Sequence, residues 1–374
     1  MQFTVSSSAL LKQLQAVGGA IGNNSTLPIL GDFLFSINGS TLTISATDLE
    51  TSMSAAIVVN ADRDGLIAVP AKIMLDMLKA LPEQPLLFKV NEDSFAIEIQ
   101  TLNGQYKLSG EDGNDFPRIP EANNNDNSIS IPAYALTNAI NKTIFAVSTD
   151  ELRPAMTGVL FDIADGEIKF VATDAHRLVK YTLSGIENAE DSTASFIVPK
   201  KALNLLKGTL PTSEIAVSIS FDRSNAFFSF NEIHLVCRLI DARFPDYNAV
   251  IPKNNDKTLS ISRTEFQNSL RRISIFSNRT TYQVVLRMTE EQLTLTAQDI
   301  DYSNEASETM PCEYTGEPMD IGFNARLLLE MVNALSNEEI RLEFSTPGRA
   351  AIMLPTENNP NEELFTLIMP IMLN

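Results

Sequence analysis

The sequence predicts an α+β protein made of three tandem repeats, each with two helices packed on β-sheets. The main sign is a short stretch that occurs three times and alternates apolar with small or polar residues, as a half-buried strand does. It ends at Asp48, Asp174 and Asp299, which lie 126 and 125 positions apart. One such match means little, but companions at the same offset indicate a threefold duplication.

The companions mark the start of a helix, the opening strand and the end of each copy. A helix start signal, Pro or Asn before an apolar stripe, stands at Pro70, Pro199 and Asn324, which lie 129 and 125 positions apart. Opening strands occur at 3–6, 129–132 and 259–262, and closing Phe-Pro or Met-Pro pairs at 116–117, 244–245 and 369–370. We therefore expect domains at 1–127, 128–252 and 253–374.

Each element follows from local signals taken in order. Apolar stripes with start and stop residues predict helices at 6–18, 70–81, 132–147, 199–210, 262–279 and 324–335. Paired strands follow the first helix of a repeat, at 32–38 and 41–47 across an Asn-Gly turn and at 156–162 and 167–173 across Asp-Gly. Polar runs at 123–127 and 253–257 predict linkers.

Length and composition bound the class of protein. A chain of 374 residues with 44% hydrophobic residues can build domains with real cores. The only two cysteines, Cys237 and Cys312, fall in different repeats, so we expect a reducing compartment, the cytoplasm. The N-terminus reads as a strand rather than a signal peptide. No apolar run reaches the roughly 18 residues that span a bilayer, so we expect no membrane contact.

The charge is distributed unevenly. The formal net charge of −19 by itself argues against nucleic acid binding. The six expected helices nevertheless carry a net +9, and the remainder carries −28. The helix bases are Lys12, Lys72, Lys79, Lys142, Lys200, Lys201, Lys207, Arg263, Arg271, Arg272, Arg279 and Arg326, and the helix acids are Asp76, Glu265 and Glu330. This pattern predicts a two-faced protein, although Lys and Arg are also good helix formers on solvated faces.

Four motifs resemble a known family. They are TLPIL at 26–30, TDAHRL at 173–178, RFPDY at 243–247, and Met-Pro at 369–370. Together they resemble the bacterial DNA polymerase III beta subunits, the beta sliding clamps, over the whole chain. The resemblance implies a homodimer in which two chains join head to tail into a ring of six domains. The helices of the ring would line a hole through which double-stranded DNA passes, and the ring would bind this DNA without sequence specificity.

The resemblance also implies partners and an absence of catalysis. The expected partners are a clamp loader, the replicative DNA polymerase and other proteins with a short hydrophobic clamp-binding motif. The ring would tether them for processivity and would need no cofactor. The DNA channel would use Lys12, Lys72, Lys79, Lys142, Lys200, Lys201, Lys207, Arg271, Arg272 and Arg279. The partner-peptide pocket would use Met156, Thr173, His176, Arg177, Leu178, Pro245, Val250, Leu367, Met369, Pro370 and Met372. The dimer interface would use Tyr106, Leu108, Ile275 and Phe276.

Four positions depart from the family pattern. Ala175 replaces a frequent Gly, and its methyl group would narrow the pocket. The end of the chain, 369–374, lacks a frequent Arg, and Asn248-Ala249 replaces Arg-Arg after the Phe-Pro-Asp-Tyr motif. These three changes imply a different peptide preference. Asn24 replaces an Arg, which puts one family DNA contact in doubt.

Two other readings compete with the clamp. His176 with Asp174 could be an acid–base pair of an enzyme, but no nucleophile arrangement, Gly-rich phosphate loop or metal-ligand cluster accompanies them in the sequence. A non-enzymatic β-repeat scaffold that binds proteins without encircling DNA would share the repeats and the apolar tail. It would not need a positive charge on the helices.

Overall fold

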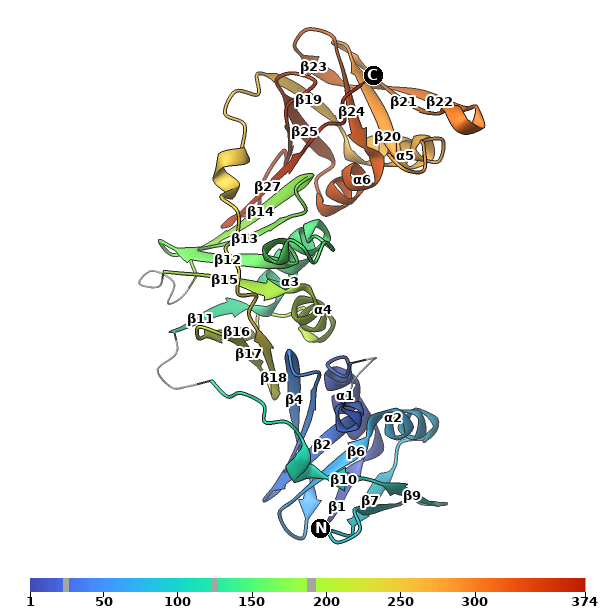
Figure 1. Ribbon diagram of the computed structural model, residues 1–374, viewed down its shortest axis with the longest axis vertical. Coiled ribbons are helices and arrows are strands. Elements are labelled where there is room, and N and C mark those ends of the chain that lie inside the picture. Colours follow the sequence, from blue (N-terminus) through green and yellow to red (C-terminus); the bar gives the residue numbers. More distant parts are fainter. Residues whose placement is uncertain (23–26, 123–126, 187–192, 374) are drawn as a thin grey trace. The chain divides into compact units, whose positions relative to one another are not determined.

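The computed structural model describes residues 1–22, 27–122, 127–186 and 193–373 (Figure 1). Asn24, Thr26, most of the linker at 123–127 and Asn374 lie outside the described residues. The chain forms two compact units, Met1–Thr137 with Lys201–Leu239, and Asn138–Lys200 with Ile240–Asn374. The division between the units runs through repeat two, because the strands of that repeat belong to two different sheets.

The described residues contain the six expected α-helices. They are α1 (Ser7–Gly18), α2 (Ala71–Ala80), α3 (Ala133–Thr143), α4 (Lys200–Thr209), α5 (Arg263–Ser274) and α6 (Ala325–Ala334). Polar side chains cap several starts: the Ser6 hydroxyl accepts the Ala9 N–H, and the Asn324 side chain accepts the N–H groups of Arg326 and Leu327. The apolar stripe of α1, at Leu10, Leu14 and Val17, is buried, and this helix packs against β3 and β4.

The helix boundaries differ from the sequence-based ones in three respects. Pro70 lies at the N-cap position of α2 rather than inside it, and Pro132 and Pro199 end strands. The helix expected to reach residue 147 stops at Thr143 and continues as the 3-10 turn η3 (Ile144–Ala146). The helix expected to reach residue 279 stops at Ser274, so Arg279 is a loop residue.

The strands account for most of the remaining backbone. Repeat one has β1 (Gln2–Ser6), β2 (Asp32–Asn38), β3 (Thr41–Thr47), β4 (Thr51–Val58), β5 (Asn60–Ala61), β6 (Gly65–Pro70), β7 (Pro85–Val90), β8 (Ala96–Gln100), β9 (Gln105–Ser109) and β10 (Glu111–Asp112). Repeat two has β11 (Asn127–Pro132), β12 (Gly158–Ala164), β13 (Glu167–Thr173), β14 (Arg177–Ser184), β15 (Ala194–Pro199), β16 (Ala216–Phe221), β17 (Asn225–Phe230) and β18 (Ile233–Arg238). Repeat three has β19 (Lys257–Ser262), β20 (Gln283–Met288), β21 (Gln292–Asp299), β22 (Asn304–Pro311), β23 (Glu313–Thr315), β24 (Met319–Asn324), β25 (Glu339–Phe344), β26 (Ala351–Pro355) and β27 (Glu362–Ile368).

Each repeat contributes two antiparallel sets of four strands. The first sets are β1-β7-β8-β9, β11-β16-β17-β18 and β19-β25-β26-β27, and the second sets are β6-β2-β3-β4, β15-β12-β13-β14 and β24-β20-β21-β22. The second set of one repeat joins the first set of the next repeat through β4–β18 and β14–β27, so two continuous nine-stranded sheets form. Among the described strands, β9 and β22 are the counterparts that have no such partner.

Candidate functional sites

The turn at 173–178 is organised by its own side chains. The Thr173 hydroxyl donates to the Arg177 carbonyl at 2.7 Å and accepts the Ala175 N–H at 3.1 Å. One oxygen of the Asp174 carboxylate accepts the N–H groups of His176 and Arg177, both at 3.0 Å. Ala175 therefore has a left-handed backbone, with φ 74°. Glycine adopts that conformation without strain, so a Gly here would relax the turn.

The Arg177 side chain ties this turn to the second helix of repeat three. Only 5% of it is exposed, and it donates to Asp174 at 3.0 Å, to the Glu330 carboxylate of α6 at 2.5 Å and to the Phe145 carbonyl at 2.5 Å. Its guanidinium also lies 5.1 Å from the centre of the Phe145 ring. These contacts occupy the guanidinium of Arg177 and leave little of its side chain open to solvent.

Three sequence-distant stretches meet around one apolar cluster. Leu178 and Leu367 face each other across β14 and β27 and are each 2% exposed. The buried Tyr247 packs on the same cluster, with the partly buried Phe244 beside it. The Tyr247 hydroxyl donates to Asp162 at 2.8 Å. Burial, followed by this hydrogen bond, raises the pKa of Tyr247 to about 12. Parts of the stretches 173–178, 243–250 and 367–373, which the family resemblance assigns to the partner-peptide pocket, are therefore in contact around this cluster.

The remaining expected pocket residues lie at several depths around this cluster. His176, Pro245, Val250, Met369 and Met372 are exposed, Met156 and Pro370 are half-buried, and Thr173 is buried. The sequence-based set omits Phe244 and Tyr247, which form part of the floor. Both belong to the RFPDY motif. The aromatic rings directly before and after Pro-Asp were the sequence signal that could have added these two residues to the set.

The C-terminal tail is held at two points. The Met369 N–H donates to the His176 carbonyl at 2.7 Å, and the Ile371 N–H donates to the Gly322 carbonyl at 2.8 Å. Gly322 on β24 permits this close approach, because a Cβ at that position would lie 2.8 Å from the Ile371 oxygen. Met369 and Met372 nevertheless remain 42% and 71% exposed. The tail thus presents methionines at the surface while its backbone is fixed.

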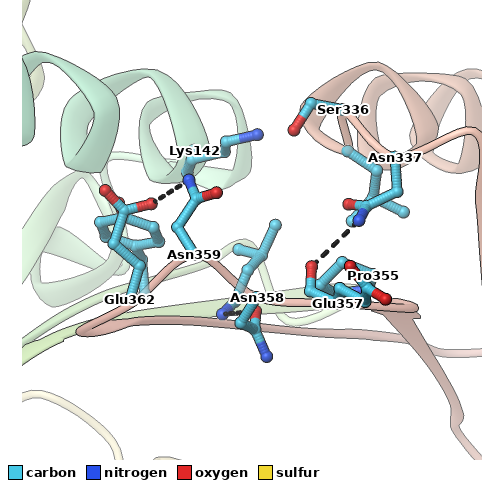
Figure 2. Close-up of a pocket in the computed structure, with 11 residues that line it drawn as sticks. Lys142, Ser336, Asn337, Pro355, Glu357, Asn358, Asn359 and Glu362 are labelled. Carbon is cyan, nitrogen blue, oxygen red and sulfur yellow. Dashed lines mark hydrogen bonds between the residues drawn. The ribbon is translucent and has the colours of Figure 1, made fainter.

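Three of the bases expected in a DNA channel are engaged by the protein itself. The Lys142 ammonium donates to the Ala334 carbonyl at the end of α6, and burial lowers its pKa. Figure 2 shows Lys142 beside the pocket that Ser336, Asn337 and the 355–362 loop also line. Lys201 donates to Asp48 at 2.5 Å and to the Ala20 carbonyl at 3.1 Å. Arg272 forms a two-point pair with Glu308 at 2.8 and 2.6 Å.

The other expected channel bases are available. Lys12, Lys72, Lys79, Lys207 and Arg271 are exposed and Lys200 is half-buried, and none of them makes a side-chain hydrogen bond or ion pair within the described part of the chain. Arg279, in the loop after α5, is also exposed.

The expected dimer residues lie at two surfaces. Tyr106, 38% exposed, and Leu108 stand on β9, the edge strand of the five-stranded sheet. Ile275 and Phe276 follow the end of α5 and are 76% and 40% exposed.

The geometry around His176 gives no support to an acid–base pair. The Asp174 carboxylate is committed to two backbone N–H groups and to Arg177. Within the described ranges, no group of three or more His, Cys, Asp and Glu residues could hold a metal ion. No helix in the described residues is long and apolar enough to cross a membrane.

Comparison with known proteins gives matches along the whole chain. Models of the DNA polymerase III beta subunit match in order: the N-terminal domain at residues 1–120, the central domain at 130–246 and the C-terminal domain at 248–372. The beta sliding clamps of Vibrio cholerae serotype O1 and Escherichia coli K12 are each 30% identical over 374 residues, with 100% of both chains covered. The sliding clamp of Pseudomonas aeruginosa, solved bound to griselimycin, superposes with a TM-score of 0.94 at 29% identity over 100% of both chains. The Bacillus subtilis sliding clamp shares the fold, with a TM-score of 0.95 at 24% identity and 100% coverage.

Proposed function

The chain belongs to the DNA polymerase III beta subunit family, and we propose that two copies close head to tail into a ring that holds double-stranded DNA. As a member of this family it is a DNA sliding clamp, with three clamp domains of α+β fold. The observation that carries the proposal is the match of all three domains in order over the full chain. The domain boundaries that we propose stay at 1–127, 128–252 and 253–374.

The sheet topology supports ring closure between repeat three and repeat one. Inside the chain, the second set of each repeat pairs with the first set of the next one, through β4–β18 and β14–β27. Among the strands that the structure describes, the counterparts without such a partner are β22 in repeat three and β9 in repeat one. An exposed edge strand is a template for pairing with another chain. We therefore assign β22 of one copy to β9 of the other, which gives two identical interfaces per ring.

The registers inside the chain fix which residues should meet. The lines Phe3–Phe88–Ile99–Tyr106, Ile129–Ile219–Phe228–Leu235 and Leu259–Leu342–Met353–Thr366 run across the three first sets. Lys107 is therefore the counterpart of Val236 and Leu367, which pair with Ser52 and Leu178. The counterpart of Ser52 and Leu178 in repeat three is Glu305. The same register thus sets Glu305 opposite Lys107 of the second copy.

The residue after the first helix adds to the same junction. A side chain at Gly19 would contact Leu205 of α4. At the next junction, the Phe145 carbonyl accepts a hydrogen bond from Arg177, and Arg177 also pairs with Glu330 of α6. Ile275 is the counterpart of Gly19 and Phe145 in repeat three. We therefore expect Ile275 to lie against α2 of the second copy, where Ile73 is 51% exposed. Burying such apolar side chains stabilises an interface by roughly 1.5–3 kcal/mol each.

The available bases give the ring a means of holding DNA without reading its sequence. Lys12, Lys72, Lys79, Lys200, Lys207 and Arg271 can attract phosphates diffusely, and such contacts release counterions and are weakened by salt. Lys142, Lys201 and Arg272 are assigned to the structure instead, because Lys142 donates to the Ala334 carbonyl and the other two pair with Asp48 and Glu308. We assign no catalytic step and no cofactor to the chain. We propose that it acts on DNA in the cytoplasm.

The apolar cluster between repeats two and three fits a short hydrophobic peptide. Leu178 and Leu367 provide the floor, and the exposed Val250, Met369 and Met372 provide an adaptable rim. We propose that the polymerase, the clamp loader and other replication proteins bind here. Val250 is 54% exposed, so an incoming apolar side chain would bury it.

Retention on DNA circles tests the proposed function. The protein is loaded onto nicked circular DNA with clamp loader and ATP, and bound protein is counted before and after the DNA is cut to a linear form. A topological ring stays on the circle and slides off the linear molecule. A protein-only scaffold would not be retained on either form, and equal retention on both would contradict encirclement.

A further inference from the structure

One buried guanidinium connects separate parts of the junction between repeats two and three. The Arg177 side chain is 5% exposed, and each of its nitrogens donates to a different part of the chain. Nε donates to the Asp174 carboxylate in the same turn at 3.0 Å, and Nη2 donates to the Phe145 carbonyl of η3 at 2.5 Å. Nη1 donates to the Glu330 carboxylate of α6 at 2.5 Å. The turn at 173–178 is thereby attached to η3 and to α6.

The shape of this turn depends on the Asp174 carboxylate. Its Oδ1 accepts the backbone N–H groups of His176 and Arg177, and its Oδ2 accepts the Arg177 Nε–H. The turn also holds Ala175 at φ 74°, a left-handed conformation that costs free energy for residues other than glycine. Strain of this kind persists only where the surrounding contacts hold the backbone in place. Arg177 is the residue that connects these contacts to α6.

The same turn carries residues of the partner-peptide pocket. Leu178 is 2% exposed, pairs with Leu367 of β27 and belongs to the apolar cluster. His176 is exposed, and its carbonyl accepts the Met369 N–H of the C-terminal tail at 2.7 Å. A displacement of the turn would therefore move the floor of the pocket and the contact that holds the tail.

The junction between repeats one and two treats the equivalent aspartate differently. In that junction, Asp48 pairs with Lys201 of α4 at 2.5 Å. The counterpart of Arg177 there is Thr51, and the counterpart of the α6 carboxylate is Leu205, so neither position carries a charge. The buried guanidinium and its carboxylate on the second helix are therefore not a requirement of the repeat. They occur at the junction that carries the proposed pocket.

We propose that Glu330 is a positioning residue for the partner-peptide pocket, because it holds Arg177 and thereby fixes the turn at 173–178. Removing the Glu330 charge would leave a buried guanidinium with a weaker set of acceptors, which is costly for a cation. The guanidinium would move toward its remaining acceptors or toward water, and the turn would move with it. The inference rests on the proposed function of the pocket and adds to it a residue that stands outside the set assigned to peptide contact.

Calorimetry of the full-length protein with a short peptide that carries a hydrophobic clamp-binding motif tests the proposal. Glu330→Gln keeps the size of the side chain and removes its charge. The dissociation constant should rise by roughly threefold to thirtyfold, as for other residues that act on a site without contacting its ligand. Glu330→Asp keeps the charge on a shorter side chain and should bind with intermediate affinity. The matched control is Glu338→Gln, which alters an exposed carboxylate in the loop between α6 and β25 and should leave binding unchanged.

A double-mutant cycle shows whether the effect passes through Arg177. Arg177→Met removes the guanidinium and keeps an apolar stem, and it should weaken peptide binding by itself. In that background, Glu330→Gln should raise the dissociation constant no further, because the pair is already lost. An equal further loss would mean that the carboxylate acts on the peptide by another route, and the proposal would be overturned.

The two histidines of the chain report on the turn directly. In protein labelled at histidine, Glu330→Gln should shift the NMR resonances of His176 and leave those of His234 unchanged, since His234 lies on β18 in the other compact unit. A general loss of stability would not single out one of the two. Weaker binding with unmoved His176 resonances would overturn the proposal, and so would undiminished binding by Glu330→Gln.

The same measurements distinguish this inference from the proposed function. If the unaltered protein does not bind the peptide, the proposed partner site itself fails. The His176 resonances then still decide whether Glu330 fixes the turn. If the unaltered protein binds the peptide and Glu330→Gln binds it equally well, only the positioning role fails.

Discussion

Asp32 is a carboxylate in an unfavourable place at the start of β2. It is 8% exposed, and burial, followed by the nearby Glu111 charge, raises its pKa from 3.8 to about 6. The two carboxylates flank β6, since Asp32 pairs with Pro70 and Glu111 with Ala68. The folded state therefore binds this proton more tightly than the unfolded chain does. The resulting stability is fully present below about pH 4 and is lost as the pH rises through about 6.

Replacing Asp32 with Asn should stabilise the protein above that range. At about pH 8 the free energy of unfolding should rise by about 1–2 kcal/mol, a discounted value because solvent reaches part of the site. At about pH 2 the gain should disappear, because Asp32 is then protonated in both states. Urea unfolding at both pH values measures this, with Asp93→Asn, on the exposed turn between β7 and β8, as the control. An equal gain at both pH values would show that the charge is not the cause.

Individual basic residues show where sequence reasoning stopped. The charge pattern identified a set of basic helices, but it could not separate Lys142, Lys201 and Arg272 from bases that remain available. Each of the three satisfies a specific acceptor: the end of α6, the Asp48 carboxylate or the Glu308 carboxylate. Those acceptors are distant in sequence, so only the folded chain brings them into reach.

At the scale of elements, local sequence signals were sufficient to predict the helices, but they could not predict which distant strands pair. Caps and apolar stripes predicted all six helices. The errors lie at the starts with Pro70, Pro132 and Pro199, which precede the helices, and at the ends of α3 and α5, where apolar residues continue past the last helical turn. Threefold repetition was visible in the sequence. The joining of repeats through β4–β18 and β14–β27 was not, because edge pairing depends on backbone groups that every residue carries.

The C-terminal tail is an element whose role can be isolated. Deleting Met369–Asn374 removes the hydrogen bonds to His176 and Gly322 and the exposed methionines, but leaves β27 paired with β14 and β26. We expect the truncated protein to remain dimeric, with some loss of stability, and to lose binding of a short hydrophobic clamp-binding peptide. Calorimetry with such a peptide measures the loss.

Milder changes provide the controls for the tail. His176→Ala and Met369→Ala should each weaken peptide binding by on the order of 1–2 kcal/mol. Leu152→Ala removes an apolar side chain that is 91% exposed and outside the proposed pocket, so it should have no effect. Undiminished binding after the truncation would place the partner site elsewhere on the chain.

At the scale of the whole molecule, closure should follow the same register that joins the repeats. Two internal junctions use one pattern, in which a second-set edge strand pairs with a first-set edge strand. Applying that pattern to β22 and β9 sets Glu305 opposite Lys107 of the second copy, with Ile275 and Phe276 at the neighbouring helix end. The two interfaces are equivalent, so a single substitution alters both.

A charge reversal tests this closure and its register together. Lys107→Glu sets two carboxylates opposite each other at both interfaces, and each like-charge pair should cost about 1 kcal/mol. The dimer dissociation constant should therefore rise by roughly tenfold to a hundredfold, most clearly at low salt. Adding Glu305→Lys to the same chain restores an opposite-charge pair and should recover the dimer. Analytical ultracentrifugation measures both, with Ile275→Ala plus Phe276→Ala as the reference for dissociation. Failure of the second substitution to rescue the first, when Lys107→Glu alone dissociates the ring, would mean that β22 and β9 meet in another register.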